Sequence, residues 1–288
     1  MEKSINWPAP AKVNWFLQVN GRRSDGYHNI QTYFQFIELQ DRLDFILKED
    51  QAICLSGTVV MHDIEEDLTV RAANLLKSHC GIKRGVEIQL KKNIPLGGGL
   101  GGGSSDAATV LVALNALWKL GLTEPELKTL GGRLGADVPV FVSGKATWAE
   151  GVGDLFYEEN GVEESILLLF PGVNVSTAKI FASSQLTRDS VPIKMEMKNI
   201  SEYRNDCEPV TKSLYPDVEE ALEWLSQYGI SKMSGTGSTI FAAFDKLENA
   251  KRVISEIPKK WSGVACKTLN RSPLLDRLRT FNVESKRE

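Results

Sequence analysis

Six of the seven residues from 97 to 103 are glycine, and this stretch, within IPLGGGLGGGSSDAA at 94–108, constrains the fold more than any other. Glycine loses more backbone freedom on folding than other residues, so concentrating it costs stability unless the backbone needs it. The alternating apolar segment VEIQLKKNIP, at 86–95, predicts a strand before the run. Apolar residues at helical spacing predict a helix over 104–120 after it. We therefore expect a strand, a glycine loop and a helix in succession.

The glycine loop has the chemistry of a phosphate site. Amides at the amino end of a helix, with the positive end of its dipole, bind phosphate, and glycine lets them approach without an obstructing Cβ. A tight strand-to-helix turn is the alternative, but one or two glycines suffice for that. The spacing of Gly97, Gly99 and Gly102 fits a dinucleotide fingerprint, yet the acidic residue expected about 20 positions later is absent. No lysine follows Gly103 to complete a Walker A loop.

The rest of the chain mixes strands and helices in both halves, and the first strands follow one another without helices between them. This order favours two α+β domains over one doubly wound parallel sheet. A shift in composition at 155–163 predicts a boundary between domains 1–158 and 159–288. The expected strands are 11–19, 30–39, 42–47, 86–95, 165–170, 239–244 and 263–269, and the expected helices are 67–81, 104–120, one from Thr123 to near 134, 215–229 and 246–257.

Composition points to a cytoplasmic enzyme. The net charge of −3 argues against nucleic-acid or membrane-surface partners, and no stretch approaches 18 apolar residues. The cysteines are scattered, as is usual for buried thiols in a reducing compartment, and the histidines lack the spacing of zinc ligands. These residues are Cys54, Cys80, Cys207, Cys266, His28, His62 and His79.

Several motifs carry a family resemblance that covers nearly the whole chain in order. PLGGGLGGGSSDAA resembles the second signature of the GHMP kinases (galactokinase, homoserine kinase, mevalonate kinase and phosphomevalonate kinase), and MSGTGSTIF, at 233–241, resembles their third. PAPAKVNWFLQVNGRRSDGYHNIQT, at 8–32, is similar to the N-terminal signature of members that phosphorylate 4-diphosphocytidyl-2-C-methyl-D-erythritol in the non-mevalonate isoprenoid pathway. GADVPVFVSG, at 135–144, and PGVNVSTAKIF, at 171–181, match the same members.

The resemblance implies a two-domain GHMP kinase fold of the α+β class. The N-terminal domain would resemble a ribosomal protein with a left-handed βαβ unit, and the C-terminal domain would be ferredoxin-like, with the active site in the cleft between them. It also implies ATP, with Mg²⁺ bound to the nucleotide rather than to a dedicated protein cage. The ATP-binding residues would be Pro95, Leu96, Gly97, Gly98, Gly99, Leu100, Gly101, Gly102, Gly103, Ser104 and Ser105.

The family places its catalytic aspartate at Asp137 and its catalytic lysine at Lys12. A carboxylate can take the proton of a hydroxyl that attacks the γ-phosphate, and a cation can stabilise the transferring group. Without the resemblance, Asp137 would be interpreted as a helix cap before Pro139, and Lys12 as a solvated residue on a strand edge. Asn14 lies on the same side of its strand as Lys12 and resembles a substrate contact.

The substrate end of the site is also implied by the resemblance. Tyr27 and His28, in DGYH, resemble cytosine-binding residues, and Phe181 matches the aromatic on the other side of the base, although core packing is its alternative. Thr177 resembles a contact to the substrate diphosphate. The chain departs from the family at Asp67, where Asn is usual. It departs again where Ser238 replaces a common Ala.

Three other functions stay open at this point. Another GHMP kinase would act on homoserine or mevalonate, but the DGYH segment weighs against it. A nucleotide-binding regulator without activity is free to lose Lys12 or Asp137, and both are present. An RNA-binding role rests on fold analogy alone and conflicts with the acidic charge. We expect a monomer or weak homodimer whose partners are the cytidyl substrate and ATP.

Overall fold

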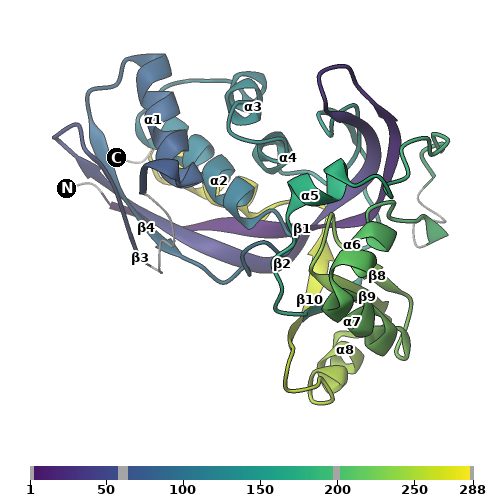
Figure 1. Ribbon diagram of the computed structural model, residues 1–288. Helices are drawn as coiled ribbons and strands as arrows, with labels where there is room; N and C mark the ends of the chain where they lie inside the picture. Colours follow the sequence, from purple (N-terminus) through teal and green to yellow (C-terminus); the bar gives the residue numbers. More distant parts are fainter. Residues whose placement is uncertain (1–2, 58–63, 197–201, 286–288) are drawn as a thin grey trace.

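The computed structural model describes residues 3–57, 64–196 and 202–285, which form a mixed α+β structure (Figure 1). Its strands are β1 (Lys3–Arg22), β2 (His28–Lys48), β3 (Ile53–Gly57), β4 (Gly85–Lys91), β5 (Thr147–Glu150), β6 (Leu155–Glu158), β7 (Ser165–Phe170), β8 (Ser231–Met233), β9 (Ile240–Phe244) and β10 (Ser262–Leu269). Its α-helices are α1 (Leu68–Cys80), α2 (Gly102–Leu117), α3 (Glu124–Gly132), α4 (Val138–Ser143), α5 (Thr177–Ala182), α6 (Glu208–Leu214), α7 (Pro216–Ser226), α8 (Leu247–Ile254) and α9 (Pro273–Glu284).

The strands of the described residues join in one sheet whose main order is β3-β4-β2-β10-β7-β9-β8. β1 and β5 also pair with β2, and among the strand pairs of the described residues only β3 and β4 run parallel. β2 was predicted as two strands, at 30–39 and 42–47, but it continues through Asp41 without a break. Long β1 and β2 therefore extend from the first half of the molecule to the second (Figure 1).

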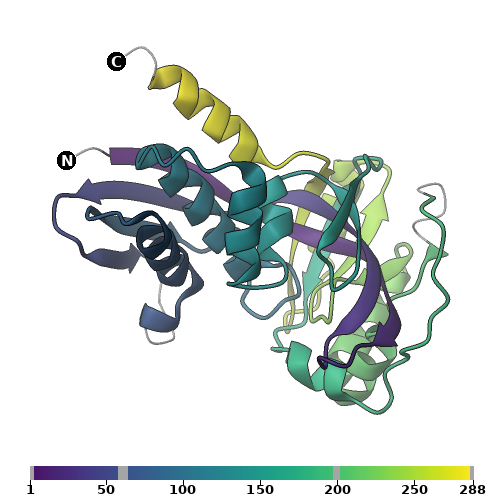
Figure 2. The same ribbon diagram turned by 90° about the horizontal axis from the view of Figure 1, so that it is seen from above.

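Three hydrophobic clusters fill the interior. One lies between the sheet and helices α1, α2 and α4; a second joins β7 and β9 to α7; and a third contains β1 residues and β7 residues. Helix α9 returns from the end of the chain to the first half, where Phe281 lies 5.6 Å from the ring of Trp7 (Figure 2). β6 ends at Glu158 and β7 begins at Ser165, and the boundary at 158 stays a prediction.

Several helix ends form as their residues predict. Asp67 caps α1 by accepting from the Thr69 amide, and Gly81 ends it in the left-handed region. Thr123 and Glu126 form the expected capping box of α3. Two expectations need correction: α2 begins at Gly102 and ends at Leu117, rather than spanning 104–120, and the segment after α3 forms a helix of its own, α4.

No helix among the described residues has the length and apolar character needed to cross a membrane. All four cysteines are free thiols. Burial raises the pKa of both Cys207 and Cys266 to about 12, so these two thiols are inert apolar groups of the core.

Candidate active site

The glycine loop meets a second glycine-containing loop, at 234–238, backbone to backbone. Gly97, Gly99 and Gly101 all have positive φ angles, between 67° and 73°, which glycine adopts without strain. A Cβ on Gly99 would lie 2.3 Å from the carbonyl oxygen of Ser234, so no other residue fits there. The Thr239 amide donates to the Gly98 carbonyl at 3.1 Å. Some of the glycines are therefore needed for the close contact between the two loops.

The following glycines differ in what surrounds them. A Cβ on Gly101 would lie 2.7 Å from the Phe141 ring, and one on Gly102 would lie 3.0 Å from Ile94. Gly103 is exposed, and its Cβ would meet only Leu68, at an ordinary 3.6 Å. The glycine at 103 is thus not required by packing, and its backbone is open to the approach of a ligand.

The amino end of α2 offers amides to that ligand. The first intrahelical bond of α2 runs from the Ser105 amide to the Gly101 carbonyl, at 2.8 Å, and the amides of Gly102, Gly103 and Ser104 precede it. Ser105 is an exception among the expected ATP contacts. It is buried, and its hydroxyl donates to the Pro10 carbonyl at 2.6 Å, so both its donors are used inside the protein.

A cavity of about 400 Å³ opens beside this helix end and brings most of the predicted residues together. It is lined from both halves of the molecule, by the glycine loop, β1, the start of α4 and α5. A larger hollow of about 840 Å³ lies between α1 and Arg133, but neither the glycine loop nor a paired carboxylate lines it. The predicted residues in the smaller cavity are Lys12, Asn14, Pro95, Leu96, Gly97, Gly98, Gly99, Leu100, Gly101, Gly102, Gly103, Ser104, Asp137, Thr177 and Phe181.

Lys12 is the buried cation of this cavity. The register of β1 against β2 shifts between Pro10 and Lys12, and the Lys12 amide donates to the Leu100 carbonyl instead, at 3.1 Å. Its Nζ lies 3.4 Å from Oδ2 of Asp137, and it donates to the Gly99 carbonyl at 3.2 Å. With 4% of its side chain exposed, Lys12 is not a solvated edge residue.

Asn14 lies beside Lys12, as the two-residue spacing in a strand predicts. Its Oδ1 accepts from Lys12 Nζ at 2.6 Å, and its Nδ2 donates to Thr32 Oγ1 at 2.8 Å. The backbone amide of Asn14 also donates to Ser234 Oγ, at 3.2 Å, and this bond joins β1 to the second glycine-containing loop. The orientation of the Asn14 amide group is therefore set by two partners before any substrate arrives.

Asp137 stands just before α4, where a capping residue would stand, yet its side chain makes no capping hydrogen bond. Its carboxylate pairs with Lys12 and is 37% exposed, so it is open to the cavity. This geometry favours the catalytic interpretation over the helix cap. A carboxylate beside a buried cation can accept a proton from a hydroxyl held in the cavity.

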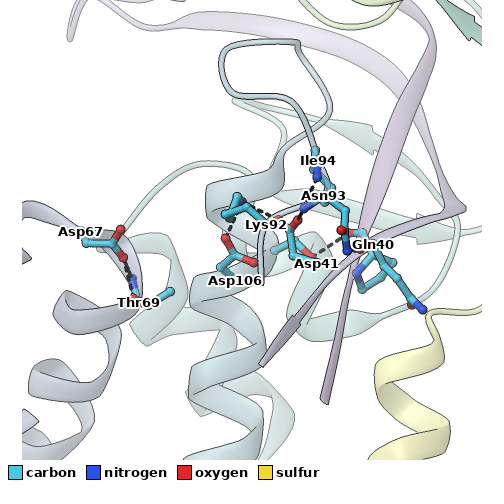
Figure 3. Close-up of polar contacts among 10 residues, drawn as sticks. Gln40, Asp41, Asp67, Thr69, Lys92, Asn93, Ile94 and Asp106 are labelled. Atoms are coloured by element: carbon cyan, nitrogen blue, oxygen red, sulfur yellow. Dashed lines mark hydrogen bonds and ion pairs between the residues drawn. The ribbon is translucent and has the colours of Figure 1, made fainter. Parts of the chain in front are cut away.

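A buried cluster of charged residues holds the segment that leads into the glycine loop (Figure 3). Asp41, in β2, is fully buried and accepts hydrogen bonds from the amides of Asn93 and Ile94, and from Lys92 Nζ. Lys92 Nζ also donates to Asp106 Oδ2, at 2.7 Å, in the first turns of α2. Desolvation raises the pKa of Asp106 to about 8. Lys92 itself lines the cavity.

Only some of the expected cytosine-binding residues lie close to one another. The rings of His28 and Phe181 lie 5.2 Å apart, and Phe181 is half-buried at the cavity. Tyr27 is 63% exposed in a turn and does not line the cavity. Thr177 Oγ1 is 3.0 Å from Thr236 Oγ1, on the second glycine-containing loop. A sandwich of cytosine between Tyr27 and Phe181 stays a prediction.

The two departures from the family have structural roles here. Asp67 caps α1, with its Oδ1 accepting from the amide and hydroxyl of Thr69 (Figure 3). Ser238 Oγ donates to the Val173 carbonyl at 2.6 Å, which holds the second glycine-containing loop against the segment before α5.

Sequence reasoning missed several residues that hold the site together. Asn205 Nδ2 donates to the carbonyls of Met233 and Gly235, at 2.9 and 2.7 Å, and so supports the second glycine-containing loop. Asp206 accepts from the Val19 amide of β1 at 2.8 Å. The only signal was a run of polar residues, RND at 204–206, outside any predicted element. Lys92 was detectable as a lysine five positions before Gly97, within the expected strand at 86–95.

Among the described residues, no group of three His, Cys, Asp or Glu side chains could hold a metal ion. His62 lies outside the described residues. Side-chain oxygens at the cavity come from the Asp137 carboxylate, the Asn14 amide group and three hydroxyls, those of Ser104, Thr177 and Thr236. Mg²⁺ prefers oxygen ligands and is usually held by one or two protein groups together with substrate phosphates, so this cavity fits Mg²⁺ that arrives with a nucleotide.

Comparison with known proteins shows the family of the chain. The chain matches the family model GHMP kinases N terminal domain over 67–145, and GHMP kinases C terminal over 189–263. The 4-diphosphocytidyl-2-C-methyl-D-erythritol kinase of Nitrosococcus oceani is 48% identical, over 94% of this chain and 96% of the relative. The enzyme of that name from Alkalilimnicola ehrlichii is 47% identical, over 97% and 96%.

Solved structures extend the similarity to three dimensions. A crystal structure of 4-(cytidine 5'-diphospho)-2C-methyl-D-erythritol kinase matches with a TM-score of 0.79 at 31% identity, covering 93% of this chain and 99% of that one. The Methanococcus jannaschii mevalonate kinase matches with a TM-score of 0.65 at 16% identity, covering 93% and 99%, and shares the fold alone.

Proposed function

The chain belongs to the 4-diphosphocytidyl-2-C-methyl-D-erythritol kinases within the GHMP kinase family, and we propose that it transfers the γ-phosphate of ATP to the 2-hydroxyl of that cytidyl substrate. The expected two-domain family fold is confirmed. The products are the 2-phosphate and ADP, and the reaction belongs to the non-mevalonate, methylerythritol phosphate route to isoprenoid precursors. One observation carries the proposal: Lys12 and Asp137 form an ion pair in the cavity that the glycine loop lines.

In this mechanism the glycine loop holds the phosphates of ATP. The amides of Gly102, Gly103 and Ser104, at the positive end of α2, donate to phosphate oxygens. Lys92 lines the cavity beside them, but its ammonium is paired with Asp41 and Asp106, so its role is to hold the start of the loop. Mg²⁺ bound with the nucleotide neutralises phosphate charge, and Ser104 and Asp137 are the residues whose oxygens would hold it.

Asp137 then acts as the base, and Lys12 as the electrostatic partner. The Asp137 carboxylate takes the proton of the 2-hydroxyl as that oxygen attacks phosphorus. The Lys12 ammonium, 3.4 Å from Asp137 and buried, stabilises charge on the transferring group. Asn14 holds Lys12 in place at 2.6 Å, and the Nδ2 hydrogen that is not bonded to Thr32 is left for the substrate.

The cytidyl end of the substrate extends toward α5. Phe181 and Tyr27 supply aromatic faces for the base, and His28 supplies a polar edge. Thr177, at the amino end of α5 and bonded to Thr236, contacts the substrate diphosphate. This end of the cavity distinguishes the cytidyl substrate from the smaller homoserine and mevalonate.

The test is ADP release by the purified protein with Mg·ATP and, separately, the cytidyl substrate, homoserine and mevalonate. We expect turnover with the cytidyl substrate alone, a phosphorus NMR signal from the 2-phosphate, and loss of that turnover in Lys12→Met. Asp217→Asn, in the exposed first turn of α7, is a matched control for Asp137→Asn and should keep full activity. Turnover with homoserine or mevalonate would assign another branch of the family, and no turnover with any acceptor would favour a nucleotide-binding regulator.

We also propose a cytoplasmic enzyme that works as a monomer or weak homodimer, without nucleic-acid or membrane partners. The acidic net charge of −3 and the four free thiols support this. Sedimentation over a range of protein concentrations measures the oligomeric state. A tight dimer at all concentrations would refute the proposal.

A further inference from the structure

Arg188 forms hydrogen bonds to two of the expected base-binding residues, His28 and Phe181. Its Nε donates to His28 Nε2 at 3.0 Å. Its Nη2 donates to the carbonyls of Phe181 and Ser183, at 2.9 and 2.7 Å, and its Nη1 donates to the Leu186 carbonyl at 3.1 Å. The guanidinium thus closes the carboxyl end of α5, where cations are favourable, while its Nε–H donates to the imidazole. Four hydrogen bonds hold Arg188 in one orientation.

The contact fixes where His28 carries its proton. A guanidinium only donates and does not lose its proton in proteins, so the His28 Nε2 must present a lone pair. The imidazole is therefore neutral, with its single hydrogen on Nδ1. Burial, together with the positive charges of Arg188 and Arg22, lowers the pKa of His28, which agrees with a neutral ring.

The Nδ1–H donor is left for a ligand. Within residues 3–57, 64–196 and 202–285, no group accepts a hydrogen bond from His28 Nδ1. The His28 ring lies 5.2 Å from the ring of Phe181, and Phe181 lines the cavity, so His28 stands directly behind a lining residue. A base stacked on Phe181 would therefore present its edge near this donor.

Cytosine and uracil differ at the atom that such a donor reads. N3 of cytosine accepts a hydrogen bond, whereas N3 of uracil carries a hydrogen and donates. An imidazole with its hydrogen on Nδ1 suits cytosine and opposes uracil donor to donor. The other tautomer, with a lone pair on Nδ1, would reverse this preference.

We propose that Arg188 is a specificity-determining positioning residue, which selects cytosine over uracil by holding His28 as its Nδ1–H tautomer. The inference rests on the proposed cytidyl substrate and adds a residue remote from the phosphoryl transfer. Removal of Arg188 lets the imidazole adopt either tautomer, so the preference for cytosine falls by about 5–150-fold, as for a buried polar group left without its partner.

The experiment measures the tautomer and the base preference separately. Long-range ¹H–¹⁵N NMR of the imidazoles, assigned with His28→Gln, gives the tautomer. Calorimetry with CDP and UDP, while ADP saturates the glycine loop, gives the base preference without turnover. We expect the Nδ1–H form and a preference for CDP in the parent protein, and loss of both in Arg188→Met. ATP KM should not change.

Two variants separate this role from simple support of α5. Arg188→Lys keeps a cationic donor and should retain the Nδ1–H tautomer and most of the CDP preference. Arg22→Met removes a charge near His28, in the strand pair that joins Arg22 to His28, and should alter neither measurement. Should Arg188→Met fail to fold, Arg188→Gln carries the same comparison.

The outcomes are distinct. An Nε2–H tautomer in the parent protein, or an unchanged CDP to UDP ratio in folded Arg188→Met, would overturn the inference. Equal loss of preference in Arg188→Met and Arg188→Lys with an unchanged tautomer would also overturn it, because Arg188 would then only support α5. Failure of the parent protein to turn over the cytidyl substrate would count against the proposed function, while the tautomer and the CDP to UDP ratio would still be measured.

Discussion

Substitution of Gly103 by alanine separates the phosphate-binding role of the glycine loop from its packing role. A Cβ at this exposed position meets only Leu68 Cδ1, at 3.6 Å, and its φ is not in the left-handed region. Gly103 lies in the first turn of α2, where alanine is favoured over glycine by up to about 1 kcal/mol. Gly103→Ala should therefore leave the free energy of unfolding unchanged or raise it.

ATP binding should change in the opposite direction. If the Gly103 amide faces a phosphate oxygen, the new methyl group occupies the side from which that oxygen approaches. A hydrogen bond to a charged group contributes about 1.5–3 kcal/mol, so its loss should raise the KM for ATP by about 10–150-fold. The KM for the cytidyl substrate should hardly change, because that substrate binds toward α5.

The assay combines denaturant unfolding with steady-state kinetics. Gly132→Ala is the matched control, because Gly132 lies at the end of helix α3 and its Cβ would meet only Pro139, at 3.9 Å. That variant should be as stable or slightly more stable, with an unchanged KM for ATP. A folded Gly103→Ala protein with the parent KM for ATP would refute the reasoning and leave the loop as a turn between strand and helix.

Four further predictions follow from the site. Asp137→Asn should lower kcat by about 10²–10⁴-fold with little change in ATP binding; near-parent kcat would return Asp137 to a structural role. Gly101→Val should destabilise the protein as well as weaken ATP binding, because its side chain would overlap Phe141; unfolding measurements that match the parent would contradict this. Tyr27→Ala should raise the KM for the cytidyl substrate about 5–150-fold and leave that for ATP unchanged, and a rise for ATP alone would place this ring at the adenine. The pKa of Asp106 is raised from its ordinary 3.8 to about 8 in the folded protein, so its ionisation destabilises the protein as pH increases through that range. The Tm of Asp106→Asn relative to that of the parent should therefore increase from about pH 4 to about pH 8, and a constant difference would contradict this.

Local signals in the sequence predicted the parts of the fold that local forces decide. Asp67 and Gly81 mark the ends of α1 because a carboxylate satisfies free amides and a glycine adopts a left-handed conformation. The glycine run predicted a loop before a helix for the same kind of reason. The need for glycine at 101 has a further cause that no local signal shows, because Phe141 lies 40 positions later and reaches the loop only through the tertiary structure.

Contacts between distant parts of the chain could not be predicted from spacing. Arg188 meets His28 across 160 positions, and Asn205 meets Gly235 across 30, through a topology that no short segment encodes. The roles of Lys12 and Asp137 came from family resemblance, since a lone lysine in a strand and an aspartate before a proline have commoner explanations. Their meeting at 3.4 Å depends on β1 and α4 packing around α2.

Asp41 explains both a wrong prediction and the rigidity of the site. Two strands were expected, at 30–39 and 42–47, with Asp41 in the gap between them, whereas β2 is continuous. A fully buried carboxylate is stable only when its oxygens are satisfied, and Asp41 accepts from two loop amides and from Lys92. The residue that interrupts the pattern is thus the one that fixes the entry to the glycine loop. Polar residues that break a strand pattern can therefore indicate where a strand supports a binding loop.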